Sequence, residues 1–210
     1  MTLDTAWARA WLARAADQIG ERSSELNELD RAIGDGDHGE NMNRGFIAVR
    51  AALDEVAGGA APSDVLRTAA MKLISSVGGA AGPLYGTAFL RASDAVSGHV
   101  ELSASDVVDL TDAALRGIEE RGHAAAGDKT MVDAWAAAVR TARGAVAAGD
   151  DAVRVLFAAA AGAEGGAAST DELLPHKGRA SYLGERAVGH RDPGAVSTAI
   201  ILKAAAEAAS

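Results

Sequence analysis

Leu29 to Phe46 reads L-D-R-A-I-G-D-G-D-H-G-E-N-M-N-R-G-F, an acidic and glycine-rich loop between two helical patterns. Asp30 lies in the first pattern, and Asp35 and Asp37 follow in the loop. Three ionised carboxylates about 5 Å apart would repel one another by roughly 3 kcal/mol per pair at an effective dielectric near 20, so a fold keeps them together only where water or a cation relieves the repulsion. Hard oxygen donors with room for water and phosphate suit Mg²⁺ better than Zn²⁺. The stretch therefore predicts a magnesium site that holds a phosphate.

Other kinds of acidic loop fit this stretch less well. The spacing and the terminal glutamate of a calcium-binding EF-hand are absent. Asp30 does not suit a merely solvated turn, because it lies four residues after Leu26 and three before Ile33 and shares their inward helix face. Gly34 to Gly39 matches the dinucleotide pattern G-x-G-x-x-G, but the preceding residues look helical and no βαβ pattern surrounds the match.

A second phosphate-loop pattern is also imperfect. Gly122 to Thr130 resembles a Walker A loop, but Asp128 intervenes before Lys129 and no strand precedes the segment. We interpret it as the cap of a helix or as coincidence.

The composition predicts a helical protein with one domain. The 210 residues are 49% hydrophobic, a share inflated by alanine, and only 4% aromatic. Abundant alanine with few β-branched runs favours close-packed helices. A chain of this length is long enough to bury a core, so we expect residues 1–210 to form a single domain.

Charge and cysteine content exclude several classes of partner. The formal net charge of −9 disfavours nonspecific binding to nucleic acid or anionic membranes. The lack of cysteine excludes disulfides and thiolate metal sites. No signal-peptide pattern opens the chain, and the apolar stretch Ala195 to Ala209 contains Lys203 and Glu207 and is too short to span a bilayer. We therefore expect a soluble, cytoplasmic protein whose partners include neither nucleic acid nor a membrane.

Apolar residues recur at helical spacing along most of the chain. The pattern predicts an all-α fold of eight or nine helices that pack as antiparallel, up-and-down neighbours. Ser63, and Ser103 with Asp106, are the expected caps of two helices. Gly58-Gly59 and Gly165-Gly166 are the expected weak points of regular structure.

Glycine-rich segments lie where these helices should meet. Besides the acidic loop they are Ser75–Gly86, Gly127–Trp135 and Lys177–Ser197. Alternate connections of an antiparallel bundle lie at the same end, so several of them can converge on one ligand and offer helix N-termini to its phosphates. Ser75–Gly86 alone is equally consistent with a helix–helix turn, and side chains such as Lys177 and Arg179 are more often ordinary surface charges.

Five motifs, in order, resemble the nucleotide-binding subunit of dihydroxyacetone kinase over essentially the whole chain. They read I-G-D-G-D-H-G-E-N-M, S-S-V-G-G-A-A-G-P-L-Y-G, G-D-K-T-M-V-D, K-G-R-A-S-Y-L-G-E-R and G-H-R-D-P-G-A. The resemblance implies a barrel of eight antiparallel helices with ADP, or ATP, and two Mg²⁺ ions bound at one end.

The resemblance also implies which residues form the site. Asp30, Asp35 and Asp37 would bind the two magnesium ions, and Arg179 would be the catalytic cation near the transferred group. Ala81 departs from the family, which commonly has a serine hydroxyl facing the phosphates there, so nucleotide affinity or exchange is expected to differ. The residues implied to line the nucleotide are His38, Gly39, Glu40, Asn41, Ala80, Ala81, Gly122, Met131, Arg179, Asp192, Pro193 and Gly194.

The family also implies partners. A dihydroxyacetone-binding kinase subunit holds the ketose covalently on a histidine, and the chain described here would deliver the γ-phosphoryl group. Stand-alone subunits of this length resemble the phosphotransferase-system type, in which bound ADP is rephosphorylated by a phosphohistidine donor protein. Three alternatives stay open: a relative that uses exchangeable ATP on another short ketose, one that acts on a fatty acyl group through a different partner, and a nucleotide-dependent regulator of a transcription factor. Whether the chain forms a homodimer is also open.

Overall fold

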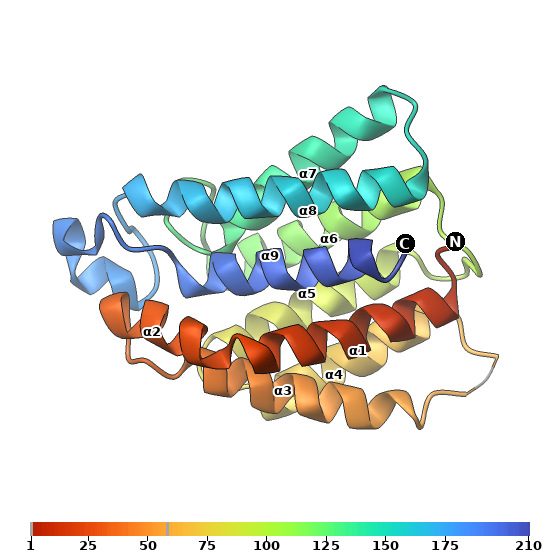
Figure 1. Ribbon diagram of the computed structural model, residues 1–210, viewed down its shortest axis with the longest axis horizontal. Helices are drawn as coiled ribbons and strands as arrows, with labels where there is room; N and C mark the ends of the chain where they lie inside the picture. The colour runs from red at the N-terminus through yellow and green to blue at the C-terminus, as the bar shows by residue number, and fades with distance from the viewer. Residues whose placement is uncertain (1, 58) are drawn as a thin grey trace.

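The computed structural model describes residues 2–57 and 59–210, which form nine α-helices and three short 3₁₀ helices (Figure 1). The prediction of an all-α fold is confirmed: the β-type pairing of the described residues is a single isolated bridge between Leu3 and Leu102. The 3₁₀ helices η1 (Thr170–Glu172), η2 (Arg179–Tyr182) and η3 (Gly184–Ala187) all precede the last α-helix. The α-helices are α1 (Thr5–Glu21), α2 (Ser23–Ile33), α3 (His38–Leu53), α4 (Pro62–Ser76), α5 (Ala81–Ala95), α6 (Ala104–Gly122), α7 (Met131–Ala147), α8 (Ala152–Ser169) and α9 (Pro193–Glu207).

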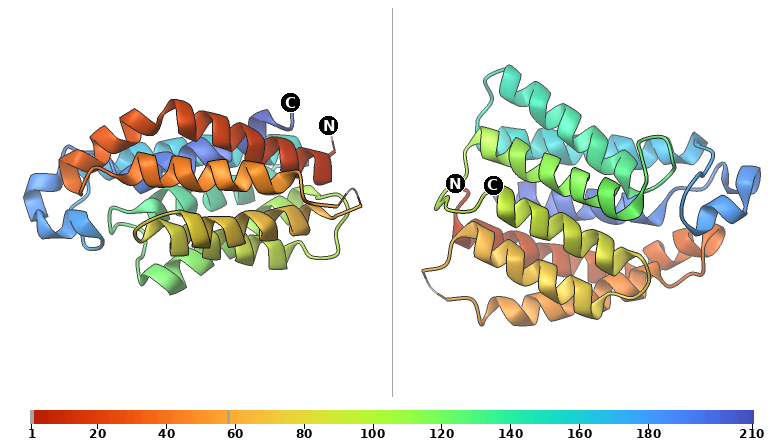
Figure 2. Two further views of the ribbon diagram at one scale, coloured as in Figure 1. Left: turned by 90° about the horizontal axis from the view of Figure 1, so that it is seen from below. Right: turned by 180° about the vertical axis from the view of Figure 1, so that it is seen from behind.

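The long helices form a closed, antiparallel ring, as the pattern predicted. From α3 to α9 each helix packs against the next, and α1 closes the ring by packing against both α9 and α3 (Figures 1 and 2). The shorter α2 follows α1 after a break at Arg22. Because direction alternates, the connections after α2, α4, α6 and α8 all lie at one end, while both termini lie at the other (Figure 1).

Two tryptophans attach the first helix to the last. Trp7 and Trp11 stack with their ring centroids 5.2 Å apart, and both are almost completely buried. Their indole N–H groups donate to the carbonyls of Ala205, at 3.0 Å, and Ile201, at 2.8 Å. Both partners lie on α9, whose alanine-rich sequence lets its neighbours approach closely. Truncating a buried aromatic residue of this size costs about 3–5 kcal/mol of folding free energy. The two tryptophans therefore hold α9 firmly against α1.

One expected helix cap is confirmed and one is wrong. Ser103 Oγ accepts the Asp106 N–H at 3.3 Å, and the Asp106 carboxylate accepts the Ser103 N–H at 2.8 Å, a reciprocal capping box. Ser63, by contrast, lies inside α4, because Pro62 already occupies its first position. The cap residue is Ala61, whose N–H donates 2.8 Å to the carboxylate three residues later.

The predicted break at Gly165-Gly166 is also wrong. Both residues lie inside α8, and the reason is packing. A Cβ on Gly166 would lie 2.6 Å from the carbonyl oxygen of Asp133, so glycine lets α8 approach α7 closely. Of the other predicted weak point, Gly58 lies outside the described residues.

None of the helices in the described part of the chain combines the length and the apolar character needed to cross a membrane.

Candidate functional site

The three predicted metal-binding aspartates meet at the loop end of the ring. Asp30 lies near the end of α2, and Asp35 and Asp37 lie in the acidic loop, residues 34–37, that leads into α3. One carboxylate oxygen from each side chain lies within 4.8 Å of the other two. Asp30 is buried whereas the two loop residues are exposed, so an ion held between them would keep a side open to water or a ligand. The donor set is entirely hard oxygen, which fits Mg²⁺.

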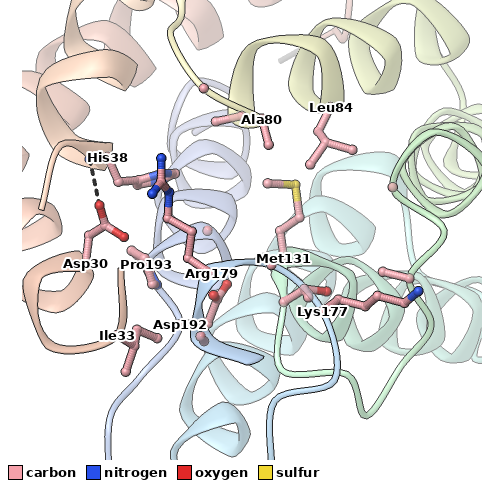
Figure 3. Close-up of a pocket in the computed structure, with 18 of the residues that line it drawn as sticks. Asp30, Ile33, His38, Ala80, Leu84, Met131, Lys177, Arg179, Asp192 and Pro193 are labelled. Atoms are coloured by element: carbon pink, nitrogen blue, oxygen red, sulfur yellow. Dashed lines mark hydrogen bonds between the residues drawn. The ribbon is translucent and has the colours of Figure 1, made fainter. Parts of the chain in front are cut away.

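Asp30 organises the acidic loop. Its Oδ2 atom accepts the N–H groups of Gly36 at 2.9 Å and Asp37 at 2.9 Å. It also accepts the N–H group of His38 at 3.2 Å, the bond drawn in Figure 3. Gly36 adopts a φ of 81°, which favours glycine. The buried carboxylate is therefore satisfied by the backbone, and the same bonds hold the loop backbone at residues 36–38 against α2.

Arg179 reaches the cluster from a distant part of the chain. Its guanidinium lies 2.7 Å from the Asp35 carboxylate, although 144 positions separate the two in sequence. Both side chains are more than a third exposed, so the pair adds little stability by itself. The ion pair matters for where it places a charge, because it holds the Arg179 cation beside the aspartate carboxylates.

A cavity of about 630 Å³ extends from the aspartates across the end of the ring. Its volume suits a ligand the size of a nucleotide. Leu84 and Met131 line it on the side away from Asp30, which gives an apolar surface opposite a charged one (Figure 3). Ile118 also lines the cavity. Helices α3, α5, α7 and α9 begin at this end, so their unpaired first-turn N–H groups and dipoles favour an anion there.

A row of buried, hydrogen-bonded side chains leads from His38, at the cavity, into the core. His38 Nε2 lies 2.9 Å from Ser197 Oγ, which lies 2.7 Å from the Tyr85 hydroxyl. That hydroxyl also contacts Thr198 Oγ1 at 2.9 Å and donates to the Gly194 carbonyl, at 2.9 Å. Burial lowers the pKa of His38 to about 4, which leaves its ring neutral near pH 7, and burial raises the pKa of Tyr85. These hydrogen-bonded side chains therefore connect α3, α5 and the start of α9 without using a charged group.

Residues 32–207 match the family described as the DAK2 domain. The chain belongs to this family. A relative from Listeria innocua, named the ADP-binding subunit DhaL of PEP-dependent dihydroxyacetone kinase 1, is 44% identical to this DAK2 chain over 97% of it and 96% of the relative. The corresponding subunit from Escherichia coli is 42% identical over 95% and 94%. Human triokinase/FMN cyclase is 34% identical over 93% of the chain, which corresponds to 34% of that longer protein.

A solved structure shares the fold of this DAK2 domain. The native form of the dihydroxyacetone kinase of C. freundii superposes with a TM-score of 0.71 at 24% identity, covering 95% of this chain and 34% of that one. The chain therefore spans about a third of that kinase. At this identity the superposition supports the fold.

Most residues that the resemblance implied for the nucleotide lie around the cavity of the DAK2 domain. Gly39 and Glu40 are exceptions, since neither lines it. A Cβ on Gly39 would lie 1.9 Å from the Ser23 carbonyl oxygen, so this glycine serves the packing of α3 on α2. The Glu40 N–H donates to Asn27 Oδ1 at 3.1 Å, and its side chain is exposed. Those that line the cavity are His38, Asn41, Ala80, Ala81, Gly122, Met131, Arg179, Asp192, Pro193 and Gly194.

Ala81 and Asp192 occupy helix starts at the cavity. Ala81 is the first residue of α5, so its N–H is one of the unpaired donors of a first turn. Asp192 caps α9 by accepting the Ala195 N–H at 2.7 Å. Burial raises the pKa of Asp192 to about 7. Both positions thus place the start of a helix at the cavity.

Sequence reasoning gave no site role to Lys129, which also lines the cavity. The residue is 1% exposed and its backbone has a φ of 61°. The neighbouring Thr130 caps α7, which fits the interpretation of this segment as a helix cap rather than a Walker A loop. Neither hydrophobic periodicity nor motif spacing signals that this lysine is buried, because its partners are backbone carbonyls remote in sequence.

Proposed function

We propose that this chain is the nucleotide-binding subunit of a dihydroxyacetone kinase, and that it transfers the γ-phosphoryl group of a bound nucleotide to dihydroxyacetone held by a partner subunit. The observation that carries the proposal is the aspartate cluster, with its oxygens within 4.8 Å of one another, at the rim of a nucleotide-sized cavity. The names of the full-length relatives, ADP-binding subunits of dihydroxyacetone kinase, support the same choice of ligand and acceptor.

The donor set suggests how the nucleotide is held. Asp30, Asp35 and Asp37 would hold two Mg²⁺ ions, whose four positive charges exceed the three negative charges of the carboxylates and would supply neutralisation of the phosphates. A solved relative of the same fold was crystallised with AMP-PNP and Mg²⁺. The first-turn N–H groups of α5 and α9 would face the phosphates, and Leu84 and Met131 would contact the flat face of the base.

Arg179 is the proposed catalytic residue. Phosphoryl transfer passes through a loose transition state whose charge spreads over the transferring oxygens. Because the guanidinium already lies 2.7 Å from Asp35, it would stand beside the transferred group without reorganising. The acceptor hydroxyl would be activated by the partner subunit, so no general base is assigned to this chain.

We further propose that ADP stays bound as a coenzyme and is rephosphorylated in place by a phosphohistidine protein of the phosphotransferase system. The support is that this chain spans nearly the full length of relatives named PEP-dependent or PTS-dependent kinase subunits.

The binding half of the proposal is tested on the purified protein alone. Mass spectrometry of the denatured protein should find ADP in about equal molar amount, and dialysis against EDTA before denaturation should remove it. Asp35→Asn should lose the nucleotide, whereas Asp109→Asn, an exposed carboxylate on α6, should retain it. Nucleotide retention that neither EDTA nor Asp35→Asn affects would contradict the proposed site.

The transfer half is tested by reconstitution. The protein is mixed with a dihydroxyacetone-binding subunit, a phosphohistidine donor and dihydroxyacetone, and dihydroxyacetone phosphate is measured. Arg179→Ala should lower kcat by about 10²- to 10³-fold, the scale of losing one group that stabilises the transition state. Absence of ketose phosphate would favour a regulatory role or another acceptor, and turnover with free ATP alone would favour the ATP-exchanging alternative.

A further inference from the structure

The segment that carries Arg179 leaves the ring and returns to it at one place. Residues 171–191, the connecting segment, run from within η1 almost to the start of α9 and contain no α-helix. At the return point the Gly189 N–H donates to the Asp171 carbonyl at 2.7 Å, and the Asp192 N–H donates to Thr170 Oγ1 at 3.0 Å. Arg191 binds the Asp171 carboxylate through two hydrogen bonds, of 3.0 and 2.6 Å. The two ends of the segment are therefore tied to each other.

Lys129 adds a tie from outside the segment. It lies in the connection between α6 and α7, and its ammonium donates to the carbonyl of Thr170 and, at 2.6 Å, to that of His190. Thr170 lies just before the connecting segment, and His190 is its second-last residue, so the two acceptors lie at opposite ends. One side chain thus holds both ends of the segment against the ring.

The far part of the connecting segment contacts the acidic loop region. Ala180 and Ala187 form a small buried cluster with Ile33, the last residue of α2, and Leu183 packs on it. From this cluster the adjacent Arg179 reaches Asp35. The cluster is separate from the main core, so the placement of Arg179 depends on a small contact at the far part and on the tie at the ends.

The position of Lys129 is costly to maintain. A lysine is almost never fully buried unless it is paired, and a φ of 61° is uncommon for any residue with a side chain. Burial lowers the pKa of its ammonium, while the nearby carboxylates of Asp192, Asp171 and Asp133 act in the opposite direction. A glycine would satisfy the backbone but could not reach the two carbonyls. Only a long cationic side chain can donate to both the Thr170 and the His190 carbonyls from this position.

We propose that Lys129 is a positioning residue: by holding the carbonyls of Thr170 and His190 it fixes the connecting segment so that Arg179 stays beside the aspartate cluster. The role assigned to Arg179 rests on the proposed function, whereas the tie between Lys129 and the segment does not. The two parts are therefore tested by separate measurements.

The tie is tested by amide hydrogen exchange on the protein free of metal and nucleotide. Lys129→Met removes the ammonium but keeps the apolar stem, Lys129→Gln keeps one donor, and Lys203→Met, an exposed lysine on α9, is the control. Exchange within residues 180–190 should rise at least about tenfold in Lys129→Met and by less in Lys129→Gln, with α1 and α4 unchanged. Unchanged exchange in both variants, or an equal rise throughout the ring, would overturn the proposal.

The consequence for catalysis is tested by a double-mutant cycle in the reconstituted transfer reaction. Lys129→Met should lower kcat by at least about tenfold in the wild-type background but by less than about twofold when Arg179 is already alanine. Lys203→Met should leave kcat unchanged. Full, independent losses in the two backgrounds would overturn positioning through Arg179. If the wild-type protein transfers no phosphoryl group, the proposed function fails, while the exchange measurement still decides whether Lys129 holds the segment.

Discussion

Replacing Asp37 by asparagine should make the protein more stable without metal and less stable with it. The Asp37 carboxylate shares the cluster with Asp30 and Asp35, all within 4.8 Å. Among the described residues no hydrogen bond or ion pair uses this carboxylate, so the substitution removes a charge without removing a bond. The shape and polarity of the side chain are nearly unchanged.

The magnitude follows from the geometry. At 4.8 Å each pair of charges repels by about 0.9 kcal/mol in a water-like dielectric of 80, and by about 3.5 kcal/mol at a dielectric of 20. Because Asp37 is exposed, the lower figure applies, and two pairs give about 2 kcal/mol. A negative charge at the start of α3 is worth about 0.3–1 kcal/mol to the helix, which offsets part of this. The expected net gain is about 1 kcal/mol, or about 2–4 °C in Tm for a chain of this length.

Thermal unfolding followed by circular dichroism, in EDTA and then in Mg²⁺ with ADP, measures the stability change without and with the ligand. In EDTA the Tm of Asp37→Asn should exceed that of the wild type. With ligand at about 100 times its Kd, the wild type should gain about 2.7 kcal/mol and the variant much less, so the order of the two Tm values reverses. Asp109→Asn should change neither result. A variant that is not stabilised in EDTA, and that gains as much from the ligand as the wild type, would refute the reasoning.

Three further predictions concern other parts of the structure. Gly166→Ala should destabilise the protein by about 1–3 kcal/mol in urea unfolding because its Cβ would lie 2.6 Å from a carbonyl oxygen of α7, whereas Gly165→Ala, with nothing within 4 Å, should stabilise it by about 0.5–1 kcal/mol; equal effects would contradict the packing. Tyr85→Phe should cost about 1–3 kcal/mol in the same assay because three buried polar groups lose a partner, and a fully stable variant would show that they find another. The hydrogen bond from Arg191 lowers the pKa of Asp171, so this pair stabilises the fold above the ordinary carboxyl pKa near 3.9 and stops doing so as pH falls through the lowered value. Asp171→Asn should therefore cost less than about 1 kcal/mol at pH 6, since the pair is partly exposed, and nothing at a pH below the lowered pKa; a loss that persists there would contradict the ion pair.

The sequence predicted local features where the signal is local. The capping box at Ser103 and Asp106 is a contact between residues three positions apart, and its prediction is confirmed. The expected break at Gly165-Gly166 was wrong because glycine can end a helix or let a neighbouring helix approach, and the difference lies in what packs against it. The same limit applies to Gly39, whose packing on α2 keeps it out of the cavity lining.

By itself the sequence predicted that this chain folds into antiparallel helices, and it singled out the aspartates of residues 29–46, whose side chains the structure brings within 4.8 Å of one another. Periodicity and short-range spacing carry that information, because they depend on residues only a few positions apart. Only the tertiary structure decided that Arg179 contacts Asp35 and that Lys129 is buried against Thr170 and His190. Those contacts join segments 41 to 144 positions apart, and the packing of the whole ring, rather than any local pattern, brings them together.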